Sequence, residues 1–213
     1  MNTQLSHTDK TRLGIISIWL FNLTALFGIY LGYQEWFMNK TLLNMMVYTF
    51  FLGLLFPLST KKQWLLFFSS FSVGMASEWI GVHSGLLFGD YQYGENLGFK
   101  IFEVPFSIGI NWGVLSFISA DIGRRITKKR YLLAVIASCL MVGLDILMEI
   151  SAPALDFWEF SGGAVPFKNY LTWFFIALLI HLFITPKMEG ENAKFSGHLL
   201  GSQYVFFLVY LFL

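Results

Sequence analysis

The sequence predicts an all-α polytopic membrane protein with about seven transmembrane helices. Of its 213 residues, 56% are hydrophobic and only 13% are charged, and its mean hydropathy is +0.62. Soluble globular chains carry about 25% charged residues, so most of this chain cannot face water. Seven apolar stretches with short connections follow one another, each near the roughly 20 residues that cross a bilayer. We therefore expect residues 1–213 to form a single integral-membrane domain.

Each predicted helix corresponds to one apolar stretch. The first stretch follows a polar segment and is too long and too weakly flanked for a cleaved signal peptide. Pro105 and Pro166 stand at the starts of the fourth and sixth helices, where the N–H group that proline lacks would be unpaired anyway. The fifth helix follows a segment with five basic residues, 124–130. The expected spans are 13–32, 41–58, 63–87, 104–120, 131–150, 168–185 and 198–213.

The positions of Lys and Arg predict the orientation of these spans. Cytoplasmic connections are enriched in Lys and Arg relative to those on the outer side. Eleven of the fourteen Lys and Arg residues fall on the side of the N-terminus, and only Lys40, Lys100 and Lys168 fall on the other. We therefore expect a cytoplasmic N-terminus and an outside C-terminus. Termini on opposite sides require an odd number of spans, which agrees with the count of seven. The expected location is the bacterial inner (cytoplasmic) membrane.

Composition and missing motifs exclude several classes of function. A net charge of +1 provides no polyanion-binding surface, so nucleic acid is not an expected partner. The single Cys139 rules out a disulfide framework, and four scattered histidines are too few for a membrane di-iron site. There is neither a GxGxxG dinucleotide motif nor a nucleophile elbow. We expect no metal and no cofactor.

The two longest connections, 88–103 and 151–167, resemble each other and both fall on the outer side. Each is rich in glycine, aromatic and acidic residues and leads into Val-Pro-Phe, at 104–106 and again at 165–167. A tryptophan follows each proline by seven residues, at Trp112 and Trp173. This pattern indicates a parallel repeat of helix, outer loop and helix. The alternative is chance similarity in a Phe-rich chain.

Polar residues inside the spans mark a candidate site, because ionisable groups are costly in a bilayer. Glu78, Asp145 and Asn111 lie on three different predicted helices at about the same depth, in the outer part of the membrane. Glu149 lies one turn from Asp145 on the same helix face. His83 and Asp90 follow Glu78 toward the outer surface. The alternative is that these groups only form structural hydrogen bonds between helices.

This set of groups suits protonation of an apolar substrate. A carboxyl in apolar surroundings tends to stay protonated and can then act as an acid. Aromatic faces, here those of Trp79, Trp112 and Trp173, attract cations through their quadrupoles. Adding a proton to an alkene produces such a cation. We interpret Glu78 as the preferred proton donor, with Asp145 as the competing candidate.

The same residues resemble the carotenoid biosynthesis hydratase family, which includes bisanhydrobacterioruberin hydratase and the γ-carotene 1'-hydratases. The resemblance covers about residues 64–185. Its most specific part is the run Glu78-Trp-Ile-Gly-Val-His-Ser-Gly-Leu-Leu-Phe-Gly-Asp-Tyr-Gln-Tyr93. The shorter pieces are Val104-Pro105, Asn111-Trp112, Leu144-Asp145 with Glu149, and Val165-Pro-Phe-Lys-Asn169 with Trp173.

The resemblance implies a hydro-lyase that adds water to the terminal isopropylidene double bond of a linear (ψ) carotenoid end group, giving a tertiary alcohol. It implies a linear or monocyclic carotenoid as substrate, the lipid bilayer as surroundings and contact with other enzymes of the carotenoid pathway. The expected catalytic residues are Glu78, Asp145, Glu149, Asp90 and His83. The expected substrate-binding residues are Trp79, Asn111, Trp112, Tyr91, Asn169 and Trp173.

Two other functions fit the same sequence. A lycopene-type cyclase shares the protonation step but lets an internal double bond capture the cation. A non-catalytic carotenoid-binding or transport protein would use the apolar surfaces without chemistry. The product separates the three, since a hydratase adds one water, a cyclase gives an isomer, and a binding or transport protein leaves the carotenoid unaltered.

Overall fold

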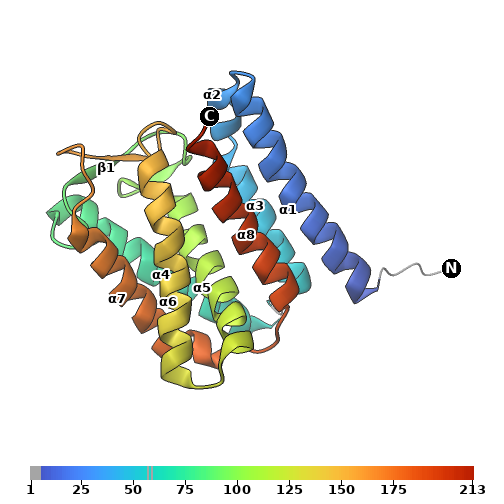
Figure 1. Ribbon diagram of the computed structural model, residues 1–213. Coiled ribbons are helices and arrows are strands. Elements are labelled where there is room, and N and C mark those ends of the chain that lie inside the picture. The colour runs from blue at the N-terminus through green and yellow to red at the C-terminus, as the bar shows by residue number, and fades with distance from the viewer. Residues whose placement is uncertain (1–5, 57, 59) are drawn as a thin grey trace.

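The computed structural model describes residues 6–56, 58 and 60–213 and is mostly helical (Figure 1). Two short antiparallel strand pairs lie in the connections. The helices, in chain order, are α1 (His7–Tyr30), α2 (Gln34–Met38), α3 (Thr41–Leu55), α4 (Lys61–Ser84), α5 (Phe106–Ile126), α6 (Arg130–Ser151), α7 (Phe167–Phe183), the 3-10 turn η1 (Thr185–Lys187) and α8 (Ala193–Tyr210). The strands are β1 (Tyr91–Tyr93), β2 (Lys100–Ile101), β3 (Val104–Pro105) and β4 (Trp158–Phe160).

Among the described residues, five helices are long and apolar enough to cross a membrane, as expected of an integral membrane protein. They are α1, α4, α5, α6, and α7 together with η1. Helices α3 and α8 occupy the two other predicted spans but are not in this set, because α3 has only 15 residues and the 18-residue α8 is less apolar than the five. Helix α1 begins and α8 ends at opposite ends of the bundle (Figure 1).

Helix boundaries differ from the predicted ones where local residues decide them. Helix α4 ends at Ser84, three residues early, because Gly85 takes a left-handed conformation (φ +62°) that caps the helix. Helix α5 continues six residues beyond its predicted end, although this part carries charged residues. Its buried Asp121 accepts hydrogen bonds from Ser196 Oγ (2.7 Å) and Asn192 N (3.0 Å), so the charged group has partners inside the protein.

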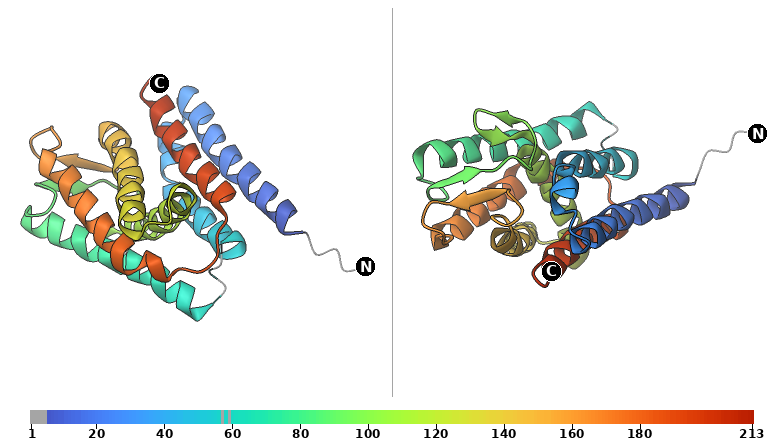
Figure 2. Two further views of the ribbon diagram at one scale, coloured as in Figure 1. Left: turned by 60° about the horizontal axis from the view of Figure 1, so that its bottom comes forward. Right: turned by 90° about the horizontal axis from the view of Figure 1, so that it is seen from above.

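Helix α5 is the centre of the bundle, in contact with α3, α4, α6, α7 and α8 (Figures 1 and 2). Nearly all of its residues are buried, including serines, Asn111 and Asp121. The other helices bury one stripe and expose large apolar side chains on the opposite side, for example Phe50, Leu65 and Phe175. Such an exposed apolar surface suits contact with lipid.

The connection between α4 and α5 and the connection between α6 and α7 meet above the helices, seen clearly from above in Figure 2. Strand β1 pairs antiparallel with β4, with Tyr91 opposite Phe160 and Tyr93 opposite Trp158. Strands β2 and β3 form a small hairpin within the first connection. The two connections that look alike in sequence therefore form one structure, which covers the ends of α4 and α6 and the starts of α5 and α7.

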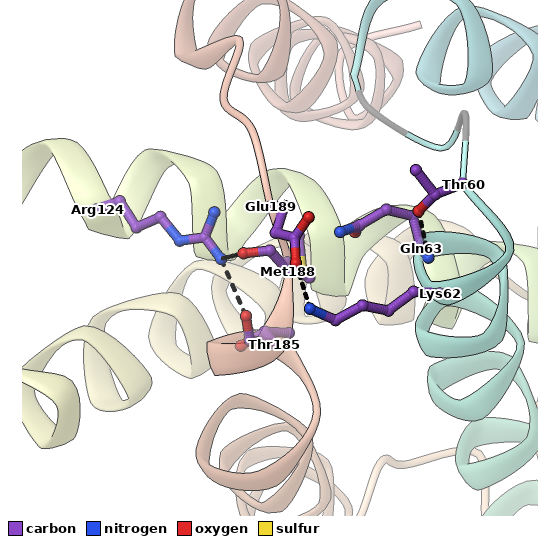
Figure 3. A network of polar contacts seen from close by, with 7 residues as sticks. All are labelled: Thr60, Lys62, Gln63, Arg124, Thr185, Met188 and Glu189. Atoms are coloured by element: carbon purple, nitrogen blue, oxygen red, sulfur yellow. Dashed lines mark hydrogen bonds and ion pairs between the residues drawn. The ribbon is translucent and has the colours of Figure 1, made fainter.

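Polar contacts fasten the opposite end of the bundle (Figure 3). Arg124, in the last turn of α5, donates to the carbonyl oxygens of Thr185 (2.9 Å) and Met188 (3.2 Å). These carbonyls belong to η1 and the residue after it, where backbone acceptors lack helical partners. Lys62 of α4 pairs with Glu189 in the segment before α8. None of the predicted site residues takes part in these contacts.

Candidate active site

Glu78 is the acceptor of three hydrogen bonds near the C-terminal end of α4. Its side chain is only 3% exposed. Tyr91 Oη lies 2.6 Å and Tyr93 Oη 2.8 Å from its Oε2 atom, and Trp112 Nε1 lies 3.2 Å from its Oε1 atom. The two tyrosines reach it together because alternate residues of a strand point the same way. The pairing of β1 with β4 thus fixes two donors on one carboxyl.

The two phenols act as donors in this arrangement. Burial raises the pKa of both Tyr91 and Tyr93 well above the usual value, and the neighbouring Glu78 charge raises them further. Both phenols therefore stay protonated at physiological pH. An indole N–H can only donate. All three groups can hence donate to an ionised Glu78 carboxylate.

Trp112 and Trp173 stack on each other in the centre of the site. Their ring centroids are 3.9 Å apart and their planes differ by 14°. These are the two tryptophans that follow the two Val-Pro-Phe segments, so the repeated pattern places one aromatic ring from α5 against one from α7. Gly74 makes room for the pair, because a Cβ there would lie 2.2 Å from Trp112 Cγ.

Asp145 and Glu149 form a second acidic group on the buried stripe of α6. The side-chain amide of Asn169 joins them, since its Nδ2 atom lies 2.7 Å from Glu149 Oε1 and 3.4 Å from Asp145 Oδ2. Trp158 Nε1 donates to Glu149 Oε2 at 2.7 Å. Asp145 Oδ1 is buried and has no hydrogen-bond partner among the described residues. Both carboxyl oxygens of Glu149 therefore accept a hydrogen bond, whereas only one oxygen of Asp145 does.

Glu78 and Glu149 line a common cavity, which we name the carboxyl cavity. Its volume is about 20 Å³. A buried water needs a polar site of roughly 10–15 Å³, so the carboxyl cavity has room for one. Its wall is otherwise mostly aromatic. The lining residues are Glu78, Phe88, Tyr91, Tyr93, Ile108, Asn111, Met148, Glu149, Trp158, Phe160, Asn169 and Trp173.

The structure brings together eight of the eleven residues predicted for the site. They are Glu78, Tyr91, Asn111, Trp112, Asp145, Glu149, Asn169 and Trp173. The other three lie outside this cluster. Trp79 is 47% exposed and its ring contacts His83, whose Nε2 atom lies 3.4 Å from Glu103 at the surface. Asp90 is also exposed. These three point away because they follow Glu78 on other faces of the helix and loop.

Sequence reasoning did not assign two donors, Tyr93 and Trp158. The alternation Tyr-Gln-Tyr at 91–93 was a usable signal, because it places both tyrosines on one side of a strand. Trp158 had no such signal, since its position depends on β4 pairing with a strand more than sixty residues away.

The described residues contain no group of three His, Cys, Asp or Glu side chains arranged to hold a metal ion. No salt bridge between described residues involves Glu78, Asp145 or Glu149. The site therefore consists of three carboxyls, neutral donors and aromatic rings.

The comparison with known families is consistent with this site. A sequence profile described as carotenoid biosynthesis protein matches residues 36–213. The match extends beyond the predicted resemblance and takes in α3 and α8 as well as the site. No curated protein and no solved structure matches the chain. Because the profile covers most of the sequence, the chain belongs to the carotenoid biosynthesis protein family.

Proposed function

We propose that the protein is a carotenoid hydratase, which adds water to the terminal isopropylidene double bond of a linear end group. The observation that carries this proposal is the carboxyl cavity. It has room for one water between two carboxyls and is walled by aromatic rings. Membership of a carotenoid biosynthesis family supplies the class of substrate. The cavity is smaller than a five-carbon end group, so the proposal requires its side chains to move apart when the carotenoid binds.

The Asp145–Glu149 pair is the proposed proton donor. Two carboxyls that share one amide, with no cation paired to them, repel each other strongly if both are ionised. One proton is therefore shared by the pair, and its titration belongs to the pair as a unit. Glu149 lines the carboxyl cavity and would deliver the proton. This assignment departs from the preference for Glu78 as the acid that the sequence favoured.

Glu78 is the proposed stabiliser of the cation. Three donors on one carboxyl favour its ionised form. A fixed negative charge beside the reacting carbon stabilises positive charge as it develops. The face of Trp173 contributes through its quadrupole. The two acids of the site would thus have opposite tasks.

The proposed reaction balances without a cofactor. The π electrons of the alkene form a C–H bond with the proton from Glu149 at the carbon that bears one hydrogen. The neighbouring carbon becomes a tertiary cation. A water held near Asn111 forms the C–O bond, and its surplus proton passes to the ionised pair. The acid is regenerated, and no electrons are exchanged with another molecule.

The proposal includes a membrane topology. With seven spans and a cytoplasmic N-terminus, the connections that carry β1 and β4 would face the outer side of a bacterial inner membrane. The carboxyl cavity lies under these connections, so water would enter from that side, while the carotenoid chain stays in the bilayer.

Product analysis tests the proposal. The protein should be produced in a bacterial host that accumulates linear carotenoids, and the pigments analysed by mass spectrometry. A hydratase adds the mass of one water to the substrate. An isomer of unchanged mass would indicate a cyclase, and an unaltered carotenoid that copurifies with the protein would indicate a binding or transport function. Either result would overturn the proposal.

Loss of one phenol should weaken the reaction. Tyr93→Phe keeps the ring but removes a hydrogen bond to a charged acceptor, so we expect the rate of alcohol formation to fall about tenfold or more. The rate should be measured in membranes with equal amounts of folded protein. Tyr204→Phe is the matched control, because its hydroxyl donates to Leu140 O (2.8 Å), outside the site. An equal loss in both variants would contradict a specific role for Tyr93.

A further inference from the structure

A second cavity lies beside the carboxyl cavity, lined by residues of α1, α3, α5, α6 and α8. Its volume is about 70 Å³. The two cavities share Ile108, Asn111 and Met148 as wall residues, so they are neighbours. Apolar side chains form much of the wall. We name the cavity the polar chamber after the polar side chains set among them, those of Asn22, Asn44, Tyr48, Asn111 and Gln203.

Part of the polar lining is already hydrogen-bonded. Asn22 Nδ2 lies 2.7 Å and Asn44 Nδ2 lies 2.8 Å from the hydroxyl oxygen of the fully buried Tyr48. This network joins α1 to α3 and holds both amides in place. Polar groups inside a membrane protein are energetically costly unless they are hydrogen-bonded. A polar network that lines a cavity therefore suggests that the cavity has a function.

Two atoms of the lining have no partner among the described residues. They are Gln203 Nε2, a donor, and Asn44 Oδ1, an acceptor. Gln203 is only 4% exposed. Leaving a buried donor or acceptor unpaired is unfavourable, and water can pair with a group of either kind. An apolar occupant would leave both unpaired.

We infer that the polar chamber binds a cluster of water molecules and passes them by Asn111 to the carboxyl cavity. At roughly 10–15 Å³ for each water, its volume holds several. The binding of water rests only on the chamber itself. Its use as the nucleophile rests on the proposed function. The chamber then explains why a polar network that no carboxyl contacts is built into α1, α3 and α8.

The tertiary cation offers a direct test, because it has two fates. Water capture gives the alcohol, whereas loss of a proton returns the alkene. In deuterated water, the second path returns alkene that carries deuterium. A variant with a poorer water supply should therefore still protonate the alkene but form less alcohol.

Gln203→Leu should lower the ratio of alcohol to deuterium-exchanged alkene about tenfold, the effect of about one lost hydrogen bond to bound water. Gln203→Glu, which can still hydrogen-bond water, should restore most of the ratio. Gln63→Leu is the matched control, since Gln63 is an equally buried glutamine in the first turn of α4. It should leave the ratio unchanged.

Several outcomes would overturn the inference. An unchanged ratio in Gln203→Leu, or equal loss of alcohol and exchange, would exclude a role in water supply. Wild-type protein that forms neither product would instead overturn the proposed function. An experimental structure would test the binding of water without depending on activity. It should show ordered water in the polar chamber, hydrogen-bonded to its polar side chains, and an acyl chain or polyene there would overturn water binding.

Discussion

Glu78→Gln should reduce alcohol formation by about 10³-fold, the loss expected when a fixed charge that stabilises the cation is removed. Glutamine keeps the size of the side chain and an oxygen that accepts from Trp112. Its amide can donate to the phenol oxygens of Tyr91 and Tyr93. The fold should therefore persist while the negative charge beside the cation is lost. Rates per folded protein and thermal unfolding of the purified variant measure the two effects separately.

Glu159→Gln is the matched control for Glu78→Gln. Glu159 lies on β4 beside Trp158 but is exposed, so its substitution should leave the rate near that of the wild type. Near-normal turnover in Glu78→Gln would mean that Glu78 is structural, and the proposed stabilisation of the cation would fail.

Substitutions in the Asp145–Glu149 pair should lower the rate by a comparable factor of about 10² to 10⁴, the usual range for general acid catalysis. Glu149→Gln removes the proton donor at the cavity, and Asp145→Asn removes the partner that keeps one proton on the pair. If the pair acts as a unit, its losses are not additive. The double variant Asp145→Asn/Glu149→Gln should then be about as slow as Glu149→Gln alone.

Deuterium exchange identifies what the pair does. Without a proton donor no cation forms, so both alcohol formation and exchange into recovered alkene should be lost together. Continued exchange in the double variant would show that another group protonates the alkene. Losses that simply multiply would contradict a shared proton.

Most helices could be predicted because hydrophobic length alone decides them. The stretches that became α1, α4, α5, α6 and α7 are long and apolar enough to cross a membrane. The short helix α2 was not predicted, because five residues between two spans give no periodic signal. The end of α5 was misplaced because charge normally ends a span. Asp121 and Arg124 remain inside the protein through partners far away in sequence.

The acidic residues of the site were predictable for a related reason. A carboxyl in an apolar helix is conspicuous, and Glu149 falls one turn from Asp145. The contacts made by the two long connections were not predictable in the same way. Whether Trp158 faces the carboxyls depends on the pairing of β1 with β4, which brings distant segments together. The polar network of Asn22, Asn44 and Tyr48 was missed because these are neutral residues, and the contact that joins Asn22 of α1 to the other two on α3 depends on helix packing.

The origin of the new atoms in the product tests the central claim most directly. The purified protein should convert a linear carotenoid in water labelled with heavy oxygen and deuterium, with unlabelled oxygen gas above it. Hydration by a carboxylic acid places the oxygen label in the tertiary hydroxyl and one deuterium on the adjacent carbon. A hydroxyl that carries unlabelled oxygen, or an adjacent carbon without deuterium, would contradict the account.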